Sequence, residues 1–81
     1  MVKISGGDGS SLEKAIIISD CNDLEGVDQE YLIMHNMFGK FQLIEQRLIK
    51  HKGKLYDQLI IEVENEIIEI FFDITDFFGK Y

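Results

Sequence analysis

The stretch Gly-Gly-Asp-Gly-Ser-Ser at residues 6–11 is the part of the sequence with the clearest capacity for chemistry. Glycine-rich turns can bring backbone N–H groups close to a phosphate, and serine hydroxyls add further donors. The same residue types also form turns in which aspartate and serine side chains bond their own backbone. We favour the turn and keep the phosphate-binding loop as the alternative. The residues of that loop would be Gly6, Gly7, Asp8, Gly9, Ser10 and Ser11.

The stretch resembles the Gly-Gly-Asp-Gly-Ser/Thr motif of phosphofructokinases and of NAD and lipid kinases, where it helps to bind nucleotide phosphates and metal. The resemblance covers six residues and implies a nucleotide-binding domain or a small enzyme. The lysine and the spacing of a P-loop are missing, and those kinases use a far longer chain to complete their site.

Other reactive residue types are few. The single cysteine, Cys21, precedes an expected helix, a position that can lower the pKa of a thiol. It stands at no metal-ligand spacing from His35 or His51, so we expect no metal and no cofactor. Asp57, Asp73 and Asp76 can gather near one end of a sheet, where turn and cap roles are commoner than a catalytic pair.

The charge balance restricts the partners. The chain carries 15 acidic and 8 basic residues, a formal net charge of −7. A phosphate backbone or an anionic membrane attracts lysine and arginine, so neither nucleic acid nor a membrane is expected as a partner. A basic protein is compatible with this charge, although such a charge also simply keeps a domain soluble.

With 81 residues the chain is expected to form a single domain over residues 1–81. Residues 1–9 hold no apolar stretch long enough for a secretion signal, and the longest unbroken apolar run, Ala15–Ile18, is far too short for a membrane span. The expected location is therefore cytoplasmic.

A helix is predicted for residues 23–38. Its apolar stripe would be formed by residues spaced three and four apart, namely Leu24, Val27, Tyr31, Met34 and Phe38. Asp23 is the expected N-cap, and Gly39 stands at the usual place for a C-terminal glycine.

The fold class is predicted as α+β, with one helix packed on a mostly antiparallel sheet of about four strands in the order strand, helix, strand, strand, strand. Ala15–Ile18 reads as a buried strand, and residues 2–5 are a further short candidate. The later strands are expected at residues 41–50, 55–64 and 67–74.

The last hairpin has a predicted register. A two-residue turn at Asn65-Glu66 would pair Glu64 with Ile67, Ile61 with Ile70 and Glu62 with Glu69. One sheet face is then wholly apolar and faces the helix. The other face offers an apolar patch for a partner or for a second copy of the chain, formed by Tyr56, Ile60, Ile67 and Phe71.

The sequence leaves the regularity of the strand at residues 41–50 open. Strand 41–50 changes its apolar parity after Leu43, which indicates either a β-bulge or two partly covered faces. The aromatic tail, residues 75–81, is expected to fold back on the body. Over almost its whole length the chain resembles a group of small uncharacterised bacterial proteins that share the Gly-Gly-Asp-Gly-Ser-Ser start, Glu30-Tyr31, Tyr56-Asp57 and the Phe-Asp-Ile-x-x-Phe-Phe-Gly-Lys ending.

The sequence shows no catalytic constellation. We therefore predict a small, non-enzymatic protein-binding module that binds another protein or its own copy. One alternative is a phosphate- or nucleotide-binding domain or small enzyme that uses residues 6–11. A second is an acidic inhibitor or immunity protein for a basic toxin, an idea that rests on size and charge.

Overall fold

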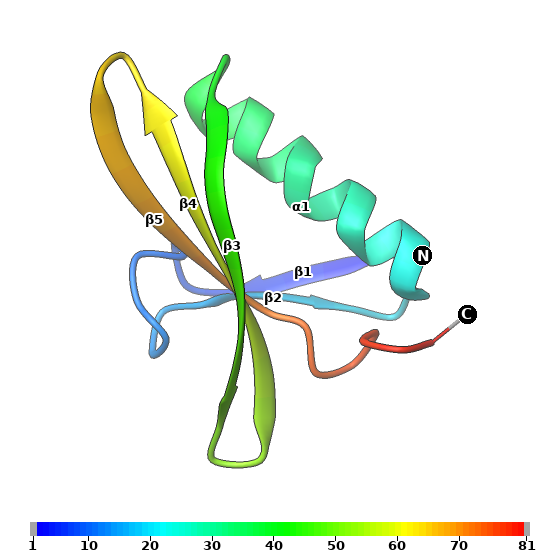
Figure 1. The fold of residues 1–81 in the computed structure, drawn as a ribbon. Helices are drawn as coiled ribbons and strands as arrows, with labels where there is room; N and C mark the ends of the chain where they lie inside the picture. Colours follow the sequence, from blue (N-terminus) through cyan, green and yellow to red (C-terminus); the bar gives the residue numbers. More distant parts are fainter. Residues whose placement is uncertain (1, 81) are drawn as a thin grey trace.

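The computed structural model describes residues 2–80 and shows one helix lying across one face of a five-stranded, mostly antiparallel sheet (Figure 1). The strand order across the sheet is β1-β2-β5-β4-β3. The elements are β1 (Lys3–Gly6), β2 (Ile16–Ser19), α1 (Asp23–Phe38), β3 (Gln42–His51), β4 (Lys54–Val63) and β5 (Glu66–Asp73). The α+β class is confirmed. The predicted count of about four strands and the order strand, helix, strand, strand, strand are wrong, because Lys3–Gly6 forms a further strand before the helix and pairs antiparallel with β2.

A parallel pair of strands in the interior of the sheet joins its N-terminal and C-terminal parts. Ile16 and Ile17 of β2 lie beside Phe72 and Asp73 of β5. β1 lies on one side of this parallel pair, and β4 and β3 lie on the other. The core lies between α1 and the sheet, and its fully buried members include Ile18, Leu59 and Phe72. β1 and β3 form the two edges of the sheet.

Helix α1 has the predicted bounds, Asp23–Phe38, but its N-cap is Asn22 and not Asp23. The Asn22 side chain accepts a hydrogen bond from the Glu25 N–H at 2.9 Å, and the Glu25 carboxylate accepts from the Asn22 N–H at 3.0 Å. This reciprocal capping box satisfies two free backbone donors. Asp23 instead binds the C-terminal segment, because its carboxylate accepts from the Gly79 N–H.

The predicted stripe of α1 is confirmed in its second half, where Met34 is buried and Tyr31 and Phe38 pack against the core, and is wrong in its first half. Leu24 is 74% exposed and Val27 37%, whereas Gly26, Glu30 and Met34 are buried. These three residues are spaced four apart, so they form their own helical stripe. The stripe is rotated because Phe77 packs directly over Gly26, where an added Cβ would lie 2.5 Å from the Phe77 ring.

The β4–β5 hairpin turns at Glu64-Asn65 and not at Asn65-Glu66. Both turn residues have positive φ, 51° and 69°, as a type I′ turn requires. Val63 therefore pairs with Glu66, Ile61 with Ile68 and Glu62 with Ile67, so the predicted register is wrong by two residues and the Glu62–Glu69 pair does not form. A shift of two keeps every side chain on its predicted face.

In β3 the register with β4 shifts between Leu43 and Glu45, which confirms the bulge among the two alternatives. The extra residue is Ile44, which is 51% exposed. Beyond it, Glu45–His51 pairs regularly with β4, which places Gln46 and Leu48 beside Leu59 and Asp57 on the helix side.

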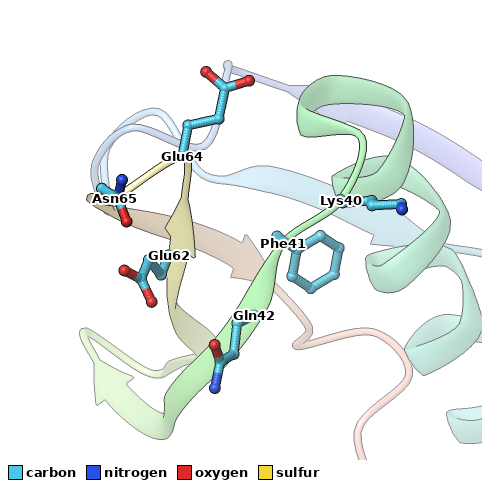
Figure 2. Close-up of a pocket in the computed structure, with 6 residues that line it drawn as sticks. All are labelled: Lys40, Phe41, Gln42, Glu62, Glu64 and Asn65. Carbon is cyan, nitrogen blue, oxygen red and sulfur yellow. The ribbon is translucent and has the colours of Figure 1, made fainter.

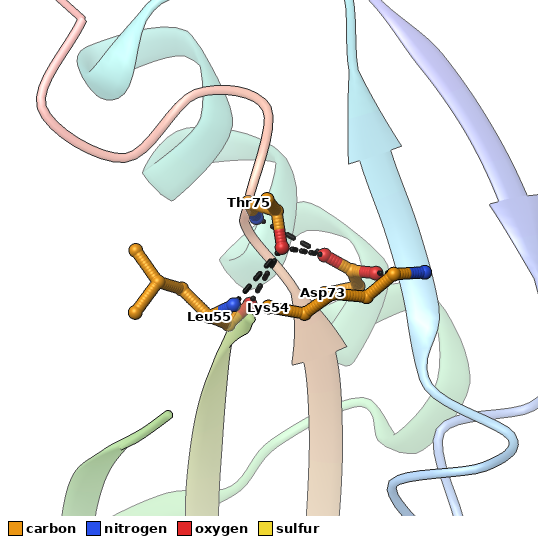
Figure 3. Close-up of polar contacts among 4 residues, drawn as sticks. All are labelled: Lys54, Leu55, Asp73 and Thr75. Carbon is orange, nitrogen blue, oxygen red and sulfur yellow. Dashed lines mark hydrogen bonds and ion pairs between the residues drawn. The ribbon is translucent and has the colours of Figure 1, made fainter. Parts of the chain in front are cut away.

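The C-terminal segment folds back on the body as predicted, with Phe77 1% exposed; Tyr81 lies outside the described residues. The Asp23 N–H donates to the Lys80 carbonyl, which fixes this segment below the start of α1. Figure 3 shows how it leaves the sheet: the Thr75 hydroxyl accepts from the Leu55 N–H at 3.0 Å and donates to Asp73 Oδ1 at 2.7 Å.

Replacing Thr75 with valine should lower the free energy of unfolding by about 1 kcal/mol, because the buried Asp73 carboxylate loses a donor. Denaturant unfolding measures this loss. Thr75→Ser keeps the hydroxyl and should retain most of the stability. A loss in Thr75→Ser with none in Thr75→Val would show that the methyl group of Thr75, and not its hydroxyl, stabilises the exit from β5.

Candidate functional site

A pocket of about 160 Å³ lies between α1, the β3–β4 hairpin and the C-terminal segment. We call it the carboxyl pocket, because two buried acidic side chains, Glu30 of α1 and Asp57 of β4, line it. Its lining residues are Asp23, Val27, Glu30, Gln46, Leu48, Asp57, Ile74, Phe77 and Phe78. Glu30 is 2% exposed and Asp57 5%.

The local sequence explains how these carboxyls come to be buried. Asp57 has the parity of Leu59 and Ile61 on β4, so it points to the helix side of the sheet. Glu30 stands midway between Gly26 and Met34 on the buried stripe of α1. The amide of Gln46 on β3 donates to both Asp57 oxygens, at 3.1 and 2.8 Å.

The Glu30 carboxyl holds a proton at neutral pH. Burial, which disfavours the charged form, raises its pKa to about 10, and its hydrogen bond with Asp57 and the charges of Asp57 and Asp23 act in the same direction. The protonated Glu30 carboxyl is therefore the donor in its hydrogen bond with Asp57. The same surroundings raise the pKa of Tyr31, first through burial and then through Glu30 and Asp57.

The pocket combines an acidic floor with an apolar mouth. Within residues 2–80, no lysine, arginine or histidine is among the residues that line it. Leu48 is 56% exposed and Phe78 47%, so the apolar wall opens to solvent beside β3. The volume is close to the roughly 150 Å³ that holds one benzene-sized guest and below the roughly 300 Å³ of common ligand sites. It therefore fits the end of one side chain.

Sequence reasoning missed Glu30, Gln46 and Asp57 as a group. A usable signal was present for Asp57, which interrupts the apolar face otherwise formed by Leu59, Ile61 and Val63. A charged residue at a core-facing position is uncommon and often marks a site. Glu30 gave no comparable signal, because its burial depends on the contact between Gly26 and Phe77.

The Gly6–Ser11 loop bonds mainly to itself and to its neighbours. Asp8 accepts hydrogen bonds from the Ser10 N–H and hydroxyl, at 3.0 and 2.6 Å, which lowers the pKa of Asp8. The Gly7 and Gly9 N–H groups donate to the carbonyls of Ala15 and Lys14. These three N–H groups are therefore already used within the β1–β2 connection, which gives a phosphate site little to build on.

The backbone of the Gly6–Ser11 loop packs so closely against its neighbours that two positions leave no room for a side chain. A Cβ at Gly6 would lie 2.4 Å from the Ala15 carbonyl, and one at Gly7 would lie 2.5 Å from that of Lys14. The Gly9 carbonyl accepts from the Phe71 N–H, so the loop continues the sheet beside β5. Close backbone packing therefore accounts for the glycine-rich composition.

The four residues of the predicted apolar patch do share the sheet face that points away from α1. Tyr56 is only 9% exposed, and Ile60 and Phe71 are half-buried. Ile67 is 62% exposed, so the patch presents one prominent side chain. It is a weaker candidate surface than the mouth of the carboxyl pocket.

Two further hollows are wider and polar. Figure 2 shows the first, about 280 Å³, between the start of β3 and the β4–β5 turn, with Phe41 between Lys40 and Gln42 in the chain and Glu62 on the neighbouring strand. The second, about 560 Å³, contains Cys21 and both Lys3 and Lys80. Burial and the acidic neighbours raise the pKa of Cys21, so the lowering that its place before the helix allowed does not occur and the thiol is a weak nucleophile at neutral pH.

The three aspartates that could have gathered near one end of the sheet do not form a cluster. Asp57 faces the helix. Asp73, which pairs with Tyr56 in the register, points to the other face and lies 3.8 Å from the Lys54 ammonium. Asp76 accepts from the Asp20 N–H and pairs with Lys80. Among residues 2–80, no three histidine, cysteine or acidic side chains are placed to hold a metal ion.

The one helix of the described chain, α1, is too short and too polar to cross a membrane. Comparisons of the chain with protein-family models, with curated proteins and with solved structures found no match.

Proposed function

We propose that the protein is a small, non-enzymatic binding module that recognises a basic protein through edge strand β3 and the adjoining carboxyl pocket. The observation that carries this proposal is the exposure of β3. Nine of its ten residues are exposed, among them Leu43, Ile44 and Leu48. Within residues 2–80, β3 pairs only with β4, so its outer backbone groups have no strand partner.

An unpaired edge strand of this length is a template for another strand. Natural sheets commonly blunt their edges with short strands, bulges or charges. The opposite edge, β1, is four residues long, and the bulge at Ile44 blunts the beginning of β3. Residues 45–51 remain regular, which leaves room for an added strand that pairs along them.

The charge of the chain favours a basic partner over a second copy. A net charge of −7 attracts cationic surfaces and repels an identical molecule. Self-pairing of β3 is the second candidate, because an antiparallel copy centred between Arg47 and Leu48 would place Glu45 opposite Lys50 of the other strand. Light scattering over a range of concentration and salt distinguishes a monomer from such a dimer.

A selection from a random peptide library tests the proposal. Peptides that bind should be extended, alternate apolar with lysine or arginine residues, and protect every second backbone amide of β3 from hydrogen exchange, since those amides face away from β4. Leu48→Glu should weaken binding about tenfold or more. Ile67→Glu is the matched control on the opposite sheet face and should leave affinity unchanged.

The opposite pattern would contradict the proposal. If Ile67→Glu abolishes binding and Leu48→Glu does not, the partner binds the face that holds Tyr56, Ile60 and Phe71. Protection confined to residues 6–11 would instead favour the loop.

A further inference from the structure

We propose that the carboxyl pocket is a receptor for one arginine side chain of the partner, whose guanidinium binds the carboxyl groups of Glu30 and Asp57. This inference rests on the proposed function, and it names the group that gives the interaction its specificity. The pocket has the two-part chemistry of arginine, with carboxyls at its floor and an apolar wall toward its mouth.

The first step of the argument is charge. Glu30 and Asp57 are both acidic and both buried, at 2% and 5% exposure. Asp23 adds a third carboxyl to the lining, and among residues 2–80 the only side-chain amide that donates to Asp57 is the neutral Gln46. The described lining supplies no cation, so a cationic guest would neutralise a charge that burial makes costly.

The second step is shape. Val27, Leu48 and Ile74 can contact a hydrocarbon stem, and the rings of Phe77 and Phe78 line the same pocket. A planar guanidinium can donate to two carboxyl groups at once and is less strongly hydrated than an ammonium. Arginine therefore fits this lining better than lysine does.

The third step is access. Gln46 and Leu48 belong both to the pocket lining and to edge strand β3. A strand added along β3 would direct alternate side chains to the helix side, next to these two residues. An arginine at such a position reaches the pocket without rearrangement of the sheet.

Binding is linked to pH. When the guanidinium enters, the Glu30 O–H proton leaves to solvent and both carboxylates accept from the guest. Asp57 from β4 and Asp23 and Tyr31 from α1 are the titratable groups around Glu30. Release of one proton makes the affinity rise with pH, by up to about tenfold per pH unit.

The test uses propylguanidinium as a probe of the pocket alone. NMR titration should shift the methyl signals of Leu48 and Ile74, more strongly at about pH 8 than at about pH 5 because the site must lose its proton. The neutral isostere propylurea should bind much more weakly. Glu30→Gln should reduce affinity for propylguanidinium about tenfold or more and remove its pH dependence.

Equal binding of the two probes, shifts confined to the hollow around Cys21, or an affinity that does not rise with pH in the unaltered protein would overturn the proposal. The last measurement needs no variant.

A capped peptide, Thr-Val-Arg-Val-Thr, tests the origin of the guanidinium. It should bind about tenfold or more tightly than propylguanidinium, because it adds pairing along β3. Equal affinity would assign the pocket to a free small cation and overturn its assignment to a partner's side chain. Failure of both probes while library peptides still protect β3 would reject this inference and leave recognition through edge strand β3 standing.

Discussion

Replacing Glu30 with glutamine is expected to hold the free energy of unfolding nearly constant between about pH 5 and pH 8, where the unaltered protein should lose about 4 kcal/mol. In the unfolded chain this carboxyl ionises near its ordinary value of about 4.3. In the folded protein the pKa of Glu30 is raised to about 10 by burial and by Asp57. The unfolded state therefore binds fewer protons over this window, and stability falls as pH rises.

Glutamine preserves the geometry, because its amide can donate to Asp57 as the Glu30 O–H does. The measurement is a series of denaturant unfolding curves at several pH values. Glu66→Gln removes an exposed carboxylate on β5 and controls for the change in net charge. Parallel pH profiles for the unaltered protein and Glu30→Gln would contradict the assignment of a proton to this pair.

The acid side of the profile has the opposite sign. Hydrogen bonds from Ser10, from Arg47 and from the Asp20 N–H lower the pKa of Asp8, Glu45 and Asp76, respectively. Their stabilising contribution is present at neutral pH and is lost as pH falls through the lowered values. Stability should therefore be greatest in mildly acidic solution and decline on both sides.

Replacing Gly26 with alanine should destabilise the fold by about 2–3 kcal/mol, although alanine is the better helix former by about 1 kcal/mol. The added Cβ would lie 2.5 Å from carbon atoms of the Phe77 ring, which is 1% exposed. The ring can move only by displacing neighbouring side chains, so overpacking outweighs helix propensity. Thermal or denaturant unfolding measures the change.

Two comparisons identify the cause. Asn36→Ala, at an exposed position of the same helix, should raise stability by a few tenths of a kcal/mol, as roughly expected from propensity. Combining Gly26→Ala with Phe77→Leu should cost less than the sum of the two single changes, because the smaller side chain makes room for the methyl group. Additive losses would mean that the two residues do not compete for space.

The features that local chemistry determines were predictable from the sequence. The bounds of α1 follow from polar residues before Leu24 and from Gly39 after Phe38, and the structure confirms them. The two faces of β4 and β5 follow from alternation with period two, which survives the error in register. The observed register depends on the positive φ of Glu64, and glutamate is not a residue type from which a positive φ is predicted.

The carboxyl pocket depends on contacts between segments that are distant in sequence. Hydropathy assigned Leu24 and Val27 to the buried face of α1, because apolar residues normally occupy it. Gly26 and Glu30 are buried in their place. Phe77 occupies the space over Gly26, and Asp57 forms a hydrogen bond with Glu30. Neither contact is visible until the C-terminal segment is placed below the helix.

The parallel pair between β2 and β5 sets the order in which the chain can be completed during synthesis. Ile16 and Ile18 of β2 leave the ribosome early, but β5, the parallel neighbour of β2, begins at Glu66. Helix α1 and the β1–β2 hairpin must therefore wait, with these isoleucines still in water, while β3 and β4 are made. β5 pairs with β4 on one side and with β2 on the other, so only its synthesis joins the β1–β2 hairpin to β4 and β3 in one sheet. Contacts of such long sequence separation make the final step a slow and cooperative one.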